Sequence, residues 1–169
     1  MRSIALAALA AVAVAAPAAA QDGAPFTGAR IGATLGYDKA QGRDGFTYGG
    51  AFGYDVAVTP NVVLGAEGTF EDTTTKFAGT HLSRDVAISA RAGYVLTPQI
   101  LGFAKVGYDT TRVEFQNGTH NNLEGVRYGG GVEYALTPRT YVSAEYRRTE
   151  YEGNFGGRDA GIVGFGVRF

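Results

Sequence analysis

The sequence predicts an all-β fold, namely an eight-stranded antiparallel up-and-down transmembrane β-barrel. Three observations predict it. Eight segments alternate apolar residues with small, polar or charged ones, as strands with two unlike faces do. Short turns that contain Thr-Pro alternate with longer polar connections. Aromatic residues gather near both ends of the expected strands.

The Thr-Pro turns define a repeating hairpin. A pattern of apolar or aromatic residues that ends in Thr-Pro occurs at Val56–Pro60, Tyr94–Pro98 and Tyr134–Pro138. The prolines are 38 and 40 residues apart, and alternating segments flank each pair. Because proline has no backbone donor, it suits a turn rather than a central strand. The repeating unit is therefore a long hairpin with a tight turn.

The first four expected strands carry apolar side chains at every second residue. In chain order these residues are Ile31, Ala33, Leu35 and Tyr37; Phe46, Tyr48, Phe52, Tyr54, Val56 and Val58; Val62, Leu64, Ala66 and Phe70; and Val86, Ile88, Ala90, Ala92, Tyr94 and Leu96. Mainly glycine, threonine and charged residues lie between them. Each segment therefore has one apolar and one polar face.

The last four expected strands follow the same rule, and the fifth is the least regular. Their apolar residues are Ala104, Val106 and Tyr108; Val126, Tyr128, Val132, Tyr134 and Leu136; Val142, Ala144 and Tyr146; and Val163, Phe165, Val167 and Phe169. In the fifth strand, Leu101 and Phe103 fall on the polar side, where we expect them to fill one end of the interior.

The direction of the two faces needs a separate argument, because alternation also fits a soluble sandwich or a lipocalin-like barrel. Tyr, Phe and Val would overfill so small a barrel, whereas glycine with scattered charges fits a narrow lumen. We also expect two aromatic belts at the membrane surfaces. They are Tyr54, Tyr94, Tyr134 and Phe169 at the turn end, and Tyr37, Tyr48, Phe70, Tyr108, Tyr128 and Tyr146 at the loop end. The apolar face should therefore meet lipid.

Residues 1–20 have the layout of a secretory signal peptide: a basic residue, an apolar run and small residues before Gln21. The apolar run is shorter than the roughly 20 residues that a membrane anchor helix requires. No cysteine follows it, which disfavours a lipoprotein. We expect residues 21–169 to form one barrel domain, with longer polar loops at Lys39–Gly45, Asp72–Ser83, Gln116–Glu124 and Glu150–Gly157.

Charge and cysteine content exclude several classes of partner. Without Arg2 the chain has 14 basic and 16 acidic residues, a balance that does not indicate nucleic-acid binding. The absence of cysteine excludes a disulfide framework and thiolate metal ligands. We expect no cofactor and no metal.

Several motifs together resemble the small outer-membrane β-barrel family that includes the OmpA transmembrane domain, the OmpX type and the opacity-protein type. They are the Gly-Tyr-Asp repeats at residues 36–38, 53–55 and 107–109, the Thr-Pro turns, and the closing strand at residues 161–169. The resemblance implies an assembly signal in Phe165, Val167 and Phe169, which the outer-membrane assembly machinery would recognise. The chain departs from the family pattern because it contains no tryptophan. We expect no peptidoglycan-binding domain after the last strand, so the resemblance does not imply tethering to the cell wall.

Charged residues of both signs fall on the expected lumen face. They are Arg30, Asp55, Glu67, Arg91, Lys105, Arg127, Glu133, Glu145, Arg147 and Arg168. Paired with one another they would form a static plug, since eight strands enclose a lumen that side chains can fill. The alternative interpretation is a gate, in which the ion pairs rearrange to admit water.

Two other kinds of site are weaker. His81 and His120 fall in expected loops without a carboxylate cluster, so a metal or haem contact is a minor alternative to solvated loop residues. A lipid-modifying enzyme of the outer membrane would need a nucleophile such as Ser83, Ser89 or Ser143. The latter two lack a histidine in their strands, and Ser83 lacks an orienting acid motif. We therefore do not expect an enzyme.

Together these features predict an exported protein of the outer membrane of a Gram-negative-type bacterium, with a structural or surface-interaction role. At most it would have a small porin-like conductance. Its expected partners are outer-membrane lipid, the assembly machinery and a possible surface ligand or host cell. A haem- or ligand-binding surface barrel is the alternative.

Overall fold

The computed structural model describes residues 26–169 except 41, 75, 78–79, 115–119 and 153–155. This part of the chain is built from β-strands. They are β1 (Gly28–Ala40), β2 (Arg43–Thr59), β3 (Val62–Thr73), β4 (Lys76–Phe77), β5 (Thr80–Thr97), β6 (Ile100–Glu114), β7 (His120–Ala135), β8 (Thr140–Tyr151) and β9 (Gly157–Arg168). In the described residues no helix is long and apolar enough to cross a membrane.

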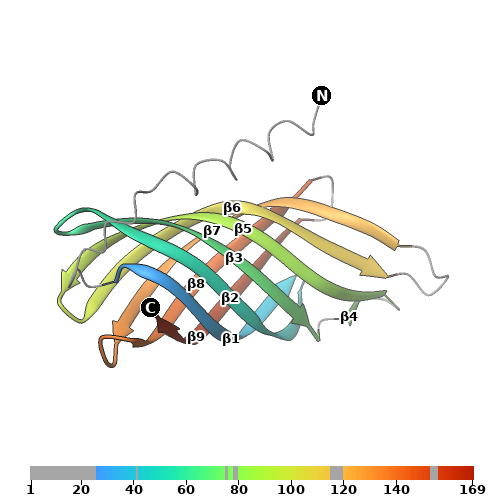
Figure 1. Cartoon of the computed structure of the whole chain (residues 1–169). Coiled ribbons are helices and arrows are strands. Elements are labelled where there is room, and N and C mark those ends of the chain that lie inside the picture. Colours follow the sequence, from blue (N-terminus) through green and yellow to red (C-terminus); the bar gives the residue numbers. More distant parts are fainter. Residues whose placement is uncertain (1–25, 41, 75, 78–79, 115–119, 153–155) are drawn as a thin grey trace.

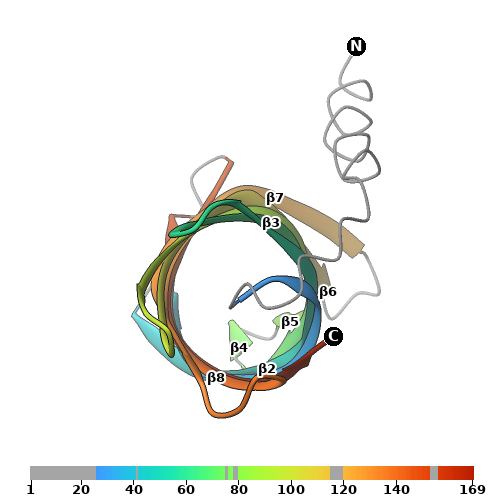
Figure 2. The same cartoon turned by 60° about the vertical axis from the view of Figure 1, so that its left-hand side comes forward.

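Eight of these strands form a closed wall. Each pairs antiparallel with its neighbours along the chain, β3 pairs with β5, and β1 pairs with β9 over Arg30–Arg168 to Ala40–Arg158. β4 is only two residues long and pairs with the loop end of β5. The ring is visible along its axis in Figure 2. The predicted eight-stranded antiparallel up-and-down barrel is confirmed.

Threonine hydroxyls stabilise the three Thr-Pro turns in the same way. Thr59 Oγ1 accepts hydrogen bonds from the backbone N–H groups of Asn61 and Val62, at 3.4 and 3.0 Å. Thr97 Oγ1 accepts one from Gln99 N–H at 3.3 Å. Thr137 Oγ1 accepts from the two residues that follow Pro138, at 3.2 and 3.0 Å. The side chain thus satisfies donors that the turn leaves without strand partners.

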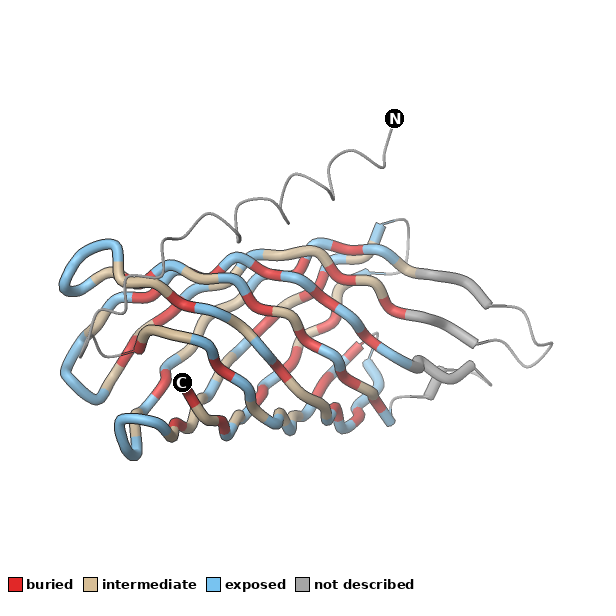
Figure 3. Tube along the Cα trace, viewed as in Figure 1, coloured by how far each residue is buried: buried red, intermediate tan, exposed pale blue. Residues whose placement is uncertain are grey.

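Burial alternates along the strands with the apolar side chains outside (Figure 3). Phe52 is 62% exposed and Val132 is 50% exposed, whereas the buried residues on the wall are mostly charged or Thr. This inverts the arrangement of a soluble protein, whose apolar side chains are mostly inside. The predicted orientation, with the apolar face outward, is confirmed.

The strands extend further toward the loop end than the sequence predicts. Lys39–Gly45, expected as a loop, is mostly a continuation of the β1–β2 ladder, which pairs Ala40 with Arg43. β9 begins at Gly157 rather than near Val163. β6 and β7 stay paired as far as Glu114 and His120. The β6–β7 ladder is the one that projects on the right of Figure 1.

Candidate functional site

The lumen holds all ten charged residues that the sequence placed there. Because side chains alternate along a strand, each lies an even number of residues from the other inward residues of its own strand. Eight of them are buried. Lys105 and Glu145 retain 9% of their side-chain exposure. They form three groups along the lumen axis.

The turn-side group closes around two carboxylates. Arg91 reaches Asp55 Oδ2 with Nη1 at 2.8 Å and Glu133 Oε2 with Nη2 at 2.7 Å. Arg168 Nη2 lies 2.7 Å from Glu133 Oε1 and 3.5 Å from Asp55 Oδ2. Arg30 Nε donates to Asp55 Oδ2 at 2.9 Å. These five residues come from five different strands, so the pairs tie opposite parts of the wall together.

The middle group is centred on Lys105, the one lysine of the described lumen. Lys105 Nζ lies 2.6 Å from Glu67 Oε1 and also contacts Glu145. Glu67 Oε2 in turn lies 2.8 Å from Arg30 Nη1, which links this group to the turn-side group. Lys105 therefore sits between two carboxylates on opposite sides of the lumen.

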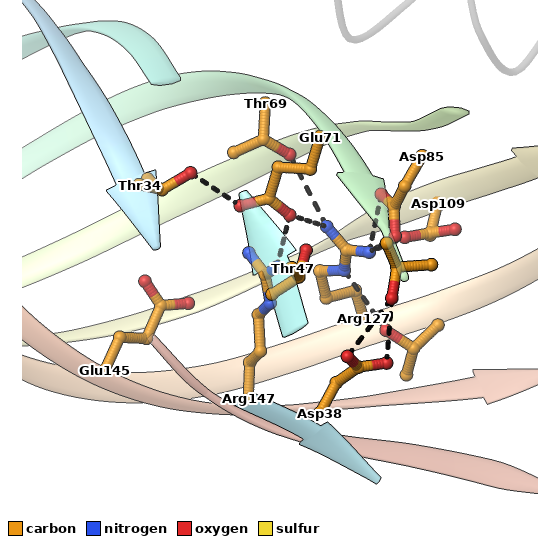
Figure 4. A network of polar contacts seen from close by, with 12 residues as sticks. Thr34, Asp38, Thr47, Thr69, Glu71, Asp85, Asp109, Arg127, Glu145 and Arg147 are labelled. Carbon is orange, nitrogen blue, oxygen red and sulfur yellow. Dashed lines mark hydrogen bonds and ion pairs between the residues drawn. The ribbon is translucent and has the colours of Figure 1, made fainter. Parts of the chain in front are cut away.

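The loop-side group contains charges that the sequence analysis left out (Figure 4). They are Asp38, Glu71, Asp85, Asp109 and Arg158, and all five are buried. Arg127 Nη2 lies 2.6 Å from Asp85 Oδ2 and also contacts Asp109. Arg147 contacts Glu71. Arg158 bridges Asp38 and Asp85 at 2.8 Å each.

A signal for these omitted residues was present in the sequence. Asp38, Glu71 and Asp109 continue the every-second-residue register of Arg30, Glu67 and Lys105 respectively. The sequence analysis did not count them among the lumen charges, although they fall on the polar face of the expected strands. Arg158 lies in the register of Arg168, but the last strand was expected to begin after it. Extending the alternation through the polar segments would have found all of them.

The described lumen holds seven basic and eight acidic side chains, so its charge is nearly balanced. Balance matters because an unpaired buried charge has a high desolvation penalty. The voids between these groups are small. One of about 30 Å³ adjoins Lys105, Glu133 and Arg147, and one of about 10 Å³ adjoins Ser89 and Arg127. Voids of this size hold about one or two water molecules. The lumen is therefore filled by its own side chains.

Apolar residues close the turn-side mouth. Phe26, Val63 and Leu101 form a buried cluster, with exposed fractions of 4%, 3% and 0%. Phe103 also faces the interior, and the Arg91 guanidinium carbon lies 4.3 Å from its ring centre. Leu101 and Phe103 thus fill one end of the interior, as expected from the fifth strand. Nothing in the sequence pattern singled out Phe26, which precedes the alternating segments.

A second polar group lies outside the barrel, at the loop end. Tyr146 donates its hydroxyl to Asp159 at 2.5 Å, and Tyr128 donates to Glu150 at 3.1 Å. Arg148 lies between the two carboxylates, 2.9 Å from Glu150 and 3.2 Å from Asp159. Aromatic side chains with polar tips are typical of membrane–water interfaces. We call these five residues the outer rim.

The other candidate residues remain without a described site. The ladders place the backbone of His81 opposite Glu114, and Glu114 opposite His120, but their side chains lie outside the described residues. The Ser83 side chain does too. Ser89 and Ser143 border the lumen voids. Among the described residues, no group of three His, Cys, Asp or Glu side chains could hold a metal ion.

A closed wall with an apolar exterior and a charged interior defines a transmembrane β-barrel. The chain matches the outer membrane protein beta-barrel domain over residues 4–169 and belongs to that family. It is 30% identical to Outer membrane protein A of Escherichia coli O157:H7 over 190 aligned positions, which include 99% of the chain. The alignment covers 52% of that relative, so the chain spans about half its length.

Two solved structures share the fold. The crystal structure of Ail, the attachment invasion locus protein of Yersinia pestis, matches with a TM-score of 0.61 at 12% identity, covering 85% of this chain and 97% of Ail. Neisserial surface protein A matches with a TM-score of 0.56 at 20% identity, covering 83% of this chain and 94% of that one. At these identities the likeness concerns the fold.

Proposed function

We propose that the protein is a surface scaffold of the outer membrane, in which a closed barrel carries its loops to the cell exterior for structural or contact roles. The observation that carries the proposal is the filled lumen. Fifteen charged side chains pair within it, and the two voids described beside them hold no more than a few water molecules. A barrel built this way supports loops well and transports poorly.

The relatives support a contact role. The second Ail structure is a complex with the heparin analogue sucrose octasulfate. By analogy, we propose a sulfated polysaccharide on a host cell as a surface ligand for this chain.

The proposal also includes export by residues 1–20, periplasmic termini, and recognition of Phe165, Val167 and Phe169 by the assembly machinery. N-terminal sequencing of protein from outer membranes should then begin at Gln21.

A small conductance is the second candidate function, and Lys105 favours it. Its ammonium group contacts Glu67 and Glu145 at once and lies beside both lumen voids. A lysine that releases Glu67 and stays with Glu145 would open a path without leaving a charge unpaired, because Glu67 keeps its contact with Arg30. This would give brief, small openings rather than a steady pore.

Planar-bilayer recording tests the closed lumen. We expect the folded wild-type protein to give no large steady current, with rare small openings at most. Large steady single-channel currents would overturn the scaffold proposal in its closed form. Gel migration of unboiled and boiled samples, with a detergent-free control, establishes that the recorded protein is the folded, lipid-facing barrel.

A further inference from the structure

The turn-side mouth of the lumen holds a side chain that belongs to no strand. Phe26 lies two residues before β1, yet it belongs to one buried apolar cluster with Leu101 on β6 and Val63 on β3. In the eight-stranded ring, β6 lies four strands from β1 in either direction. Phe26 therefore lies in the mouth of the lumen, in a cluster that includes a residue of the opposite wall. Figure 2 shows the start of β1, in blue, inside the ring.

The backbone around Phe26 is shaped to place its side chain in this mouth. Phe26 has a φ of 66°, in the left-handed region that a bulky side chain rarely adopts. Gly28 has a φ of 103°, and a Cβ there would lie 2.1 Å from the carbonyl oxygen of Phe169. Such a conformation persists only where the surrounding packing holds it. The apolar cluster supplies that packing.

Polar atoms that water would hydrate lie behind the aromatic ring of Phe26. The Arg168 guanidinium carbon lies 5.7 Å from the Phe26 ring centre. Its Nη1 atom and the Oδ1 atom of Asp55 are buried, and neither has a hydrogen-bond partner among the described residues. Unpartnered buried polar atoms favour the entry of water. The Phe26 ring of the apolar cluster lies next to one of these groups, the Arg168 guanidinium, at the turn-side mouth.

We propose that Phe26 is a plug built into the chain: an autoinhibitory contact that seals the lumen at its turn side. Phe26 then determines whether water reaches the ion pairs of Arg168, Asp55 and Glu133 from that side. Release of Phe26 opens the mouth while the ion pairs remain as a second barrier. The inference rests on the proposed closed lumen and adds the device that closes one end of it.

Thiol labelling tests the plug directly, because the chain contains no cysteine. Val63→Cys places a thiol of nearly the same size inside the cluster, where the native side chain is 3% exposed. The detergent-folded variant is treated with a charged maleimide, and the labelling rate is measured by mass spectrometry. We expect slow labelling with Phe26 present and at least tenfold faster labelling when Phe26→Ala is added.

Matched variants separate the plug from general loosening. Phe52→Ala removes the same side chain from the outer wall, where it is 62% exposed, and should leave the labelling rate unchanged. Phe26→Leu keeps an apolar side chain in the mouth and should restore most of the protection. If Phe26→Ala does not give a heat-modifiable barrel, Phe26→Val replaces it, with an intermediate rate expected.

The outcomes distinguish the plug from the closed lumen on which it rests. Slow labelling at equal rates with phenylalanine or alanine at position 26 would overturn the plug and leave the closed lumen standing. Fast labelling even with Phe26 in place would show an open mouth and overturn both. Faster labelling in the Phe52→Ala control to the same extent would also reject a specific role for Phe26.

Discussion

Arg158 and Asp38 are 120 residues apart in the chain, and the Nε atom of the first lies 2.8 Å from the Oδ2 atom of the second. The pair lies inside the seam at which the last strand meets the first. Asp38 also accepts a hydrogen bond from Thr73 Oγ1 on β3 at 3.2 Å, and Arg158 also reaches Asp85 on β5. One ion pair thus ties the seam to two further strands of the wall.

Breaking the seam pair should be costly. Arg158→Ala leaves Asp38 and Asp85 without this buried partner, and we expect a loss of about 3 to 5 kcal/mol in the free energy of unfolding. Urea unfolding in lipid vesicles, followed by tyrosine fluorescence or circular dichroism, measures it. Arg148→Ala on the outer rim is the control, because exposed ion pairs contribute about 0 to 1 kcal/mol. Equal losses in the two variants would contradict the prediction.

Neutralising Lys105 should raise the frequency of channel openings. In Lys105→Met, the carboxylates of Glu67 and Glu145 lose the ammonium group between them, so we expect more frequent openings in planar bilayers. Lys39→Met makes the same chemical change on an exposed residue and should have no effect. An unchanged opening frequency in Lys105→Met would exclude Lys105 from any gate.

The lipid-facing wall should reject charge according to depth. Leu64 and Val132 are 43% and 50% exposed on the outer face. Leu64→Arg or Val132→Arg should cost about 2 to 4 kcal/mol if the site lies at the bilayer midplane. Val58→Arg, one residue before the end of β2, should cost only about 0 to 1 kcal/mol. Unfolding in vesicles compares them, and a cost independent of position would contradict the expected immersion.

Two glycines on opposite faces should respond differently to the same substitution. A Cβ at Gly131 would lie 2.1 Å from the Ala144 carbonyl oxygen, so Gly131→Ala should destabilise by about 1 to 3 kcal/mol. At Gly161 a Cβ would meet nothing within 4 Å. Gly161→Ala should be neutral or stabilising by about 0.4 to 1 kcal/mol. A reversed order in urea unfolding would show that lumen crowding does not constrain Gly131.

The terminal residue should matter for assembly in cells more than for folding in detergent. Phe169 is 79% exposed, and its backbone N–H donates to the Ala29 carbonyl at 2.8 Å. Deleting it removes little buried surface, so heat-modifiable folding in detergent should persist. The amount of the truncated protein in outer membranes should fall, whereas Phe52→Ala should leave the amount of protein there unchanged. Wild-type levels of the truncated protein would refute the assembly signal.

The sequence predicted the wall because lipid and lumen impose opposite chemistry on alternate residues. That rule weakens beyond the membrane, because the outer face of a strand meets water there instead of lipid. Lys39–Gly45 therefore looked like a loop although Ala40 pairs with Arg43. The same weakness hid Asp38 and Arg158. Phe26 could not be predicted from periodicity, because its role comes from a backbone reversal that brings it into a cluster with a residue of β6, four strands away around the ring.

The strands end at unequal distances beyond the outer tyrosines. β6 continues for six residues past Tyr108, to Glu114, whereas β1 continues for three past Tyr37, to Ala40. At about 3.3 Å per residue, the ladder runs roughly 20 Å past the tyrosine on one side and roughly 10 Å on the other. The rim of the barrel is therefore oblique. A large molecule that approaches along the membrane meets a tall paired wall from the β6–β7 side and a low edge from the β1–β9 side, so the two sides of the barrel offer it unlike surfaces.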